Sequence, residues 1–186
     1  MFSMINKLRL VILLLLISVP LSIISVQKQT WIYFVNSLGT TQIGLEDACL
    51  GTYCEKFRTT DLNHVNSYIF INIYISSLLQ VISIIAIIVG LKVEHLPNIC
   101  AQWTVIVRVG LCCSLSCLGF ASFIFLVGLK ISKNHYGGIL DCSGLIFTLD
   151  KTQLFRLYPG ECFYFLTSAT VLNTICLVTV ISIDMF

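Results

Sequence analysis

The sequence predicts an all-α membrane protein, a bundle of four transmembrane helices with a small extracellular antiparallel β-sheet. Hydrophobic residues make up 57% of the 186 residues and charged residues only 11%, whereas a soluble domain is nearer half apolar and a quarter charged. The apolar residues gather in four long runs, and strand-forming residues lie between the first two runs. The net charge of +2, without a basic stripe, gives no indication of a nucleic-acid partner.

Each apolar run is long enough to cross a lipid bilayer as a helix, which takes about 20 mostly apolar residues. The runs are continuous rather than alternating, which favours helices over barrel strands. We expect one domain over residues 1–186, with spans at 8–26, 67–91, 103–129 and 162–183. The expected connections are a first outer loop at 27–66, a cytoplasmic linker at 92–102 and a second outer loop at 130–161.

The first run has a second interpretation, because Lys7 and Arg9 before an apolar stretch are typical of a cleaved signal peptide. No clear cleavage site follows, however, and the apolar stretch continues past Pro20. We therefore expect this run to be retained as a span. Four spans place both termini on one side of the membrane, but Lys and Arg are also frequent in the long loops, so charge does not decide which side.

The cysteines in the two long loops indicate the orientation of the chain in the membrane better than the charged residues do. Cys49 and Cys54 flank a four-residue stretch containing Gly51, which favours a hairpin loop whose strands bring the two Cα atoms within disulfide range. Cys142 and Cys162 bracket the second loop as a second candidate pair; the alternative is that Cys162 is a buried thiol at the start of its span. Disulfides persist on the oxidising side of a membrane, so we expect a multi-pass plasma-membrane protein with both termini cytoplasmic.

The other cysteines indicate no chemistry. Those within the spans act as small hydrophobes, and neither His nor carboxylate accompanies them, so we expect no metal, cofactor or catalytic residue. Cys100 lies in the expected cytoplasmic linker, close to the membrane. One hypothesis is that it is S-palmitoylated, and the alternative is that its thiol is unmodified.

Two helical faces carry polar or small residues. The second span places Asn72, Ser76, Gln80, Ser83 and Gly90 on one face. This face should point into the bundle. One interpretation is a polar pathway for an ion or small solute; the other, which we favour, is hydrogen bonding between helices.

The third span has a face of small residues, Gly110, Ser114, Cys117 and Ala121. Small residues let two helices approach closely. Packing within one chain explains this face more simply than dimerisation, which leaves a homo-oligomer as the alternative.

The first outer loop is rich in strand formers at 31–35 and 40–43, followed by the first cysteine pair. We expect a small antiparallel sheet on the bundle, with Trp31 at the membrane interface, where aromatic residues gather. Loops on a rigid scaffold commonly carry recognition.

These features resemble the claudin superfamily, whose signature runs through a Trp, a Gly-Leu pair and two Cys. Here the matching residues are Trp31, Gly44, Leu45, Cys49 and Cys54. The four residues between the two Cys look most like the branch of peripheral myelin proteins, epithelial membrane proteins and lens fibre membrane intrinsic protein. The resemblance implies a left-handed four-helix bundle with an extracellular sheet, in which the motif residues have structural roles.

The chain departs from this pattern as a divergent member would. Glu46 stands where the signature has a second Trp, and no Arg shortly precedes the second span. The second loop is longer and has its own candidate cysteine pair, and the fourth span starts with Phe163-Tyr164-Phe165.

Three functions compete. The first is a non-enzymatic membrane protein for cell–cell adhesion, junction formation or membrane organisation, acting on other membrane proteins through its outer loops. The second is an auxiliary subunit that escorts or modulates a channel or receptor. The third, a membrane thiol oxidase, needs a reactive pair that is commonly spaced C-x-x-C, and Cys49 and Cys54 lie further apart. We favour them in that order.

Overall fold

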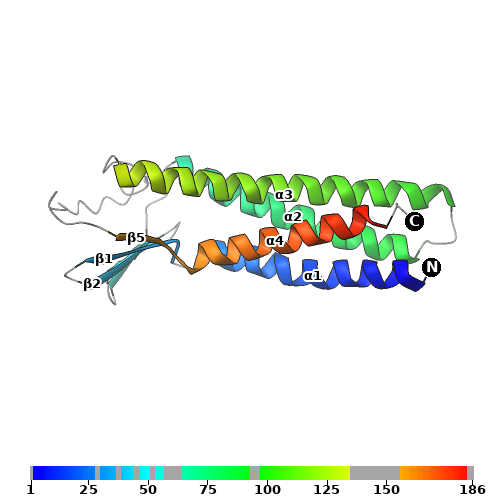
Figure 1. Ribbon diagram of the computed structural model, residues 1–186, viewed down its shortest axis with the longest axis horizontal. Helices are drawn as coiled ribbons and strands as arrows, with labels where there is room; N and C mark the ends of the chain where they lie inside the picture. Colours follow the sequence, from blue (N-terminus) through cyan, green and yellow to red (C-terminus); the bar gives the residue numbers. More distant parts are fainter. Residues whose placement is uncertain are drawn as a thin grey trace.

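Four long helices form a bundle with a small sheet at one end (Figure 1). This computed structural model describes residues 2–27, 30–36, 39–43, 47–50, 53–56, 64–92, 97–134 and 156–183. The helices are α1 (Phe2–Gln27), α2 (His64–Lys92), α3 (Pro97–Asn134) and α4 (Glu161–Ile181). Helix α1 begins, and α4 ends, away from the sheet (Figure 1); we call the two ends of the bundle the sheet end and the terminal end.

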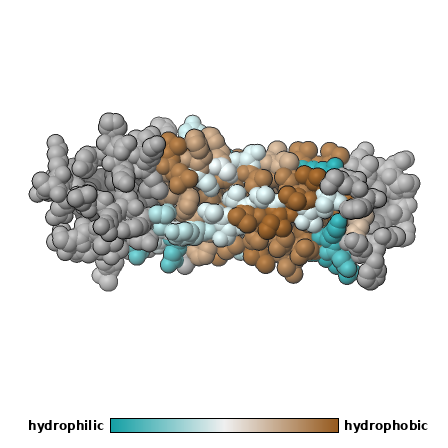
Figure 2. Space-filling model, in the orientation of Figure 1, coloured by the Kyte–Doolittle hydropathy of each residue, from teal (hydrophilic) through white to brown (hydrophobic). Residues whose placement is uncertain are grey.

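All four helices are long and apolar enough to cross a membrane, which confirms the prediction of a multi-pass, four-helix membrane protein. Their apolar spans are Met4–Gln27, Ser67–Lys92, Trp103–Val127 and Glu161–Ile181. Apolar side chains predominate in the middle of the face seen in Figure 2, with residues of intermediate hydropathy among them, as suits a lipid-facing surface. Helix α3 extends beyond its span, and its start at Pro97 makes part of the expected 92–102 linker helical. Proline suits a first helical turn, where the missing amide hydrogen leaves no bond unmade.

Five short strands form one antiparallel sheet in the order β4-β3-β2-β1-β5. The strands are β1 (Ile32–Asn36), β2 (Gly39–Ile43), β3 (Asp47–Leu50), β4 (Tyr53–Lys56) and β5 (Arg156–Pro159). Strand β5 follows α3 in the chain and pairs with β1, so that Val35 lies opposite Arg156. The sheet therefore joins segments from both long loops. The side of the membrane on which it lies stays a prediction.

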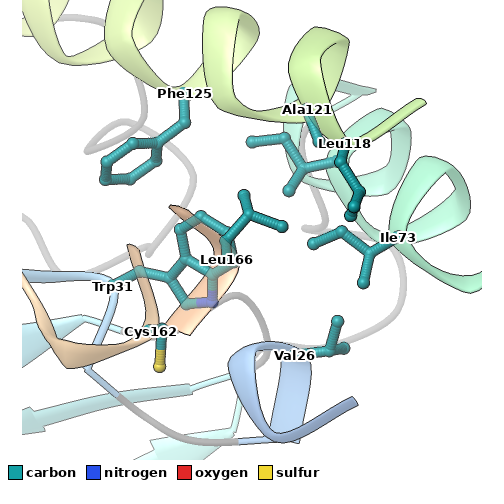
Figure 3. Close-up of a cluster of buried hydrophobic side chains, with 9 residues drawn as sticks. Val26, Trp31, Ile73, Leu118, Ala121, Phe125, Cys162 and Leu166 are labelled. Carbon is teal, nitrogen blue, oxygen red and sulfur yellow. The ribbon is translucent and has the colours of Figure 1, made fainter. Parts of the chain in front are cut away.

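The helices form a ring in which each packs against two neighbours: α1 against α2 and α4, and α3 against α2 and α4. Two apolar clusters fill the interior. The sheet-end cluster contains Val26, Trp31, Ile69, Ile73, Leu118, Ala121, Phe125, Cys162 and Leu166 (Figure 3). The terminal-end cluster contains Leu8, Val11, Leu15, Ile87, Trp103, Val107, Leu111, Cys176 and Val180.

Each cluster includes one of the two tryptophans. At the terminal end, Gly90 of α2 lies beneath the Trp103 indole of α3, so closely that a Cβ on Gly90 would fall 2.5 Å from Cδ2 of the ring. At the sheet end, Trp31 is only 1% exposed. The indole is therefore turned into the bundle and not toward lipid, and the depth of Trp31 relative to the membrane interface stays a prediction. The reason is long-range: residues 30–31 lie against the start of α4, which draws the indole into the bundle.

That junction is made by backbone atoms. The amide of Gly160 donates to the carbonyl of Trp31 at 2.7 Å, and the amide of Cys162 donates to the carbonyl of Thr30 at 3.1 Å. The second bond satisfies one of the amides that a helix start leaves without an intrahelical partner. The segment leading into β1 is thus hydrogen-bonded to the residues that connect β5 to α4, which fixes the sheet to the bundle.

Candidate functional site

Polar side chains are buried inside the bundle at membrane depth. Nine of the described polar residues are buried: Ser18, Ser22, Ser25, Ser76, Ser77, Gln80, Ser83, Ser114 and Asn173. Burying a polar group in an apolar environment is costly unless it is hydrogen-bonded. The hydrogen-bond partner of each residue therefore shows whether its side chain is satisfied within its own helix or links two helices.

Most of the buried serines bond to their own helix. Ser22, Ser77 and Ser83 each donate to the carbonyl four residues earlier, and Ser25 donates to the carbonyl of Ser22. Such bonds satisfy the hydroxyl within one helix and add nothing between helices. Ser18 is the exception on α1, since its hydroxyl donates to the carbonyl of Ala169 on α4 at 3.2 Å.

Four residues on three helices form a connected group, which we call the polar cluster: Ser76 and Gln80 of α2, Ser114 of α3 and Asn173 of α4. The Oγ atoms of Ser76 and Ser114 lie 2.7 Å apart. Gln80 Nε2 donates to Ser114 Oγ at 3.2 Å and reaches Ser76 Oγ at 3.4 Å. Asn173 Nδ2 donates to Ser114 Oγ at 3.1 Å and to the carbonyl of Leu111 at 3.4 Å. The Ser114 hydroxyl is thus the centre on which three helices converge.

The polar cluster lies deep in the membrane-spanning region. Gln80, Ser114 and Asn173 each stand near the midpoint of their apolar spans. Along α2 and α3 the cluster is flanked by members of the two apolar clusters, with Ile73 and Ile87 on α2 and Leu118 and Leu111 on α3. The cluster itself has no ionisable side chain, so it can donate and accept hydrogen bonds while carrying no charge.

The structure confirms that the polar face of the second span points into the bundle, since Ser76, Gln80, Ser83 and Gly90 are all buried. Asn72 differs: it is partly exposed, and its side-chain amide donates to the carbonyl of Tyr68 on its own helix. The contacts of Gln80 and Ser76 with Ser114 are the hydrogen bonds between helices that we favoured.

The small face of the third span also points inward, with Gly110, Ser114 and Ala121 buried. A Cβ on Gly110 would fall 2.7 Å from Ser83 Oγ, so α2 and α3 approach closely here. This contact supports packing within one chain as the reason for the small residues.

Asn173 is the member of the site that the sequence did not reveal. It stands in a span with several Thr residues, which donate to their own helix: Thr167, Thr170, Thr174 and Thr179. The residue type itself could have indicated the position. The Asn side chain has two donor hydrogens and an acceptor oxygen, which one turn of its own helix cannot satisfy together. An amide in the middle of an apolar span therefore indicates an interior position better than a hydroxyl does.

We expect Ser114→Ala to lower the free energy of unfolding by about 2 kcal/mol, because both amide groups and the Ser76 hydroxyl lose their shared partner. The measurement is reversible unfolding of the purified chain in mixed micelles by increasing amounts of a denaturing detergent. The matched control is Ser116→Ala on the same helix, where an exposed hydroxyl bonds only the carbonyl of Cys112. Equal losses for the two variants would show that Ser114 has no special role.

The expected disulfide positions are only partly described. Cys49 of β3 lies directly opposite Cys54 of β4, and Leu50 pairs with Tyr53, so the hairpin loop is shorter than the expected four residues. Opposite Cα atoms in an antiparallel pair lie about 4.5–5.5 Å apart, a spacing that suits a disulfide. The Cys49–Cys54 bond itself stays a prediction.

The other predicted positions fall in several places. Cys162 is completely buried in the sheet-end cluster, whereas Cys142 lies outside the described residues, so their pairing stays a prediction. Gly44 and Leu45 also lie outside the described residues. Cys100 stands in the first turns of α3, and its palmitoylation is untested. On the outer face of α3, Cys112 and Cys113 are exposed thiols.

The chain matches no protein-family model, and no curated protein is significantly similar to it. The resemblance to the claudin superfamily therefore stays an expectation from the sequence motif.

Proposed function

We propose that this chain is a non-enzymatic four-span protein of the plasma membrane that acts in cell–cell adhesion, junction formation or membrane organisation. In this proposal the sheet faces outward and both termini lie in the cytoplasm. The partners are other membrane proteins, in the same membrane or the opposite one, and the chain is a divergent member of the claudin superfamily.

One observation carries the proposal: segments of both long loops form a single sheet that is hydrogen-bonded to the end of the bundle. Strand β1 pairs with β2 from its own loop and with β5 from the other, and the Gly160–Trp31 bond connects the sheet to α4. These backbone hydrogen bonds hold the β1–β5 side of the sheet on the bundle, and recognition commonly resides on segments that a rigid scaffold positions. The superfamily plan of a bundle with a sheet from its outer loops is consistent with this arrangement.

The proposal predicts that non-adherent cells expressing the full chain aggregate. Gln42 is exposed in the middle strand β2, so Gln42→Arg should reduce aggregation several-fold by placing a large charged group on the sheet. Gln27→Arg is the matched control, because Gln27 is equally exposed but belongs to α1 and not to a strand. Aggregate size is measured at equal surface amounts of protein, and wild-type cells that stay dispersed would rule out adhesion through this sheet.

The auxiliary-subunit alternative is favoured by one feature, the outer face of α3. Cys112, Ser116 and Gly119 are exposed there at helical spacing, and a Cβ on Gly119 would meet nothing within 4 Å. A face of small residues lets another transmembrane helix approach closely. Co-purification of a larger channel or receptor in stoichiometric amount, lost on Gly119→Leu, would favour this alternative over adhesion.

A further inference from the structure

Two oxygen atoms in the polar cluster have no hydrogen-bond donor. Gln80 Oε1 and Asn173 Oδ1 are both buried, and no described residue donates to either. Both side chains are 0% exposed, so neither oxygen reaches the lipid surface or bulk water. Buried acceptors without a donor are rare in native proteins, because each loses its hydration and gains nothing in return.

The cluster cannot supply these donors itself. Both amide nitrogens are directed at Ser114 Oγ, and that of Asn173 also reaches the carbonyl of Leu111. The hydroxyls of Ser76 and Ser114 share one hydrogen bond at 2.7 Å, and neither hydroxyl lies within hydrogen-bonding distance of Gln80 Oε1 or Asn173 Oδ1. The nitrogen of each amide is thus bonded to Ser114, and the oxygen of each amide is left without a donor.

We propose that the polar cluster binds a long-lived water molecule, which donates one hydrogen bond to Gln80 Oε1 and one to Asn173 Oδ1. Water has the two donors that two carbonyl oxygens require, and buried water commonly satisfies such groups. A cation is the less suitable ligand, because the cluster offers no carboxylate to offset a charge at the middle of the membrane.

The surroundings predict that this water exchanges slowly. The sheet-end cluster, with Trp31 and Phe125, and the terminal-end cluster, with Trp103, are packed along the bundle axis on either side of the polar residues. Exit of the water along the bundle axis therefore requires one of the apolar clusters to open. The proposal does not depend on what the sheet binds.

Nuclear magnetic resonance of the full chain in micelles, with labelled Asn and Gln side-chain nitrogens, tests the proposal. The side-chain amide protons of Gln80 and Asn173 should show nuclear Overhauser cross-peaks to water. Their sign should be that of water that stays bound for longer than nanoseconds. The exposed Gln27 amide is the control for ordinary surface water and should lack them. The absence of such cross-peaks at both Gln80 and Asn173 would overturn the proposal.

Two further measurements test the sharing and the identity of the ligand. Asn173→Leu should abolish the long-lived signal at Gln80, because the water loses one of its two acceptors; a signal that persists would contradict a shared water. If this variant does not fold, the wild-type spectrum still decides. The unfolding midpoint of the wild type should be equal in sodium, potassium and choline chloride. A rise specific to one alkali cation would assign the site to that ion instead of water.

Discussion

Replacing Gly160 by alanine is expected to lower the free energy of unfolding by about 3 kcal/mol and to release the sheet from the bundle. A Cβ at this position would collide with the carbonyl oxygen of Thr30 and lie 2.6 Å from its carbonyl carbon and 2.9 Å from that of Trp31. All three are backbone atoms, which cannot rotate away as a flexible side chain does. Overpacking typically costs about 1–3 kcal/mol, and here the shift also weakens the hydrogen bonds of Gly160 and Cys162.

The cost at Gly160 is one of space and not of backbone conformation. Its φ of −85° and ψ of −179° are extended, which alanine adopts readily. Gly119→Ala is the matched control, because a Cβ there meets nothing within 4 Å, and it should leave the stability unchanged or slightly raised. Detergent unfolding gives the stability, and limited proteolysis of the strands reports release of the sheet. If Gly160→Ala is as stable and as protease-resistant as Gly119→Ala, the junction does not hold the sheet.

The parts of the fold that sequence predicts are those that local composition determines. A run of about 20 apolar residues has few alternatives to a helix in a membrane, so four spans are predictable, and spacings of three and four residues identify the inward face of α2. Strands β1 and β2 fall on the two runs of strand formers. The ends of α3 are less predictable, because a helix continues beyond the lipid wherever its backbone can stay hydrogen-bonded.

What sequence does not predict depends on contacts between distant residues. The pairing of β5 with β1 joins residues more than 100 positions apart, and nothing local in Arg156–Pro159 indicates it. Burial of Trp31 follows from the same junction. For the candidate site, the α2 and α3 residues could be placed on inward faces, but their meeting with Asn173 at Ser114 requires the packing of α4. Local pattern thus predicts which face of a helix turns inward, but not which residues it meets there.

Trp31→Ala should produce the largest loss of stability, about 4 kcal/mol, within the range for removing a buried aromatic side chain. The Trp31 ring packs edge-on against Phe125, with ring centroids 4.9 Å apart, and Phe125 stacks on Phe163 at 5.1 Å. The indole Nε1 has no hydrogen-bond partner among the described residues. The loss is therefore one of packing, and Trp31→Phe, which keeps a ring against Phe125, should recover about half of it.

The position of Trp31 also predicts where the damage occurs. The chain has two tryptophans, so the tryptophan fluorescence of Trp31→Ala comes from Trp103 alone, which is buried in the terminal-end cluster. Because the two apolar clusters are separated by the polar cluster, Trp103 emission should keep its buried character in the variant while the strands become protease-sensitive. Phe123→Ala removes a ring that is 63% exposed on α3 and should change neither measurement. Equal stability of Trp31→Ala and Phe123→Ala would contradict the contribution of Trp31 packing to stability, whereas a red shift of the Trp103 emission would show that the two ends of the bundle loosen together.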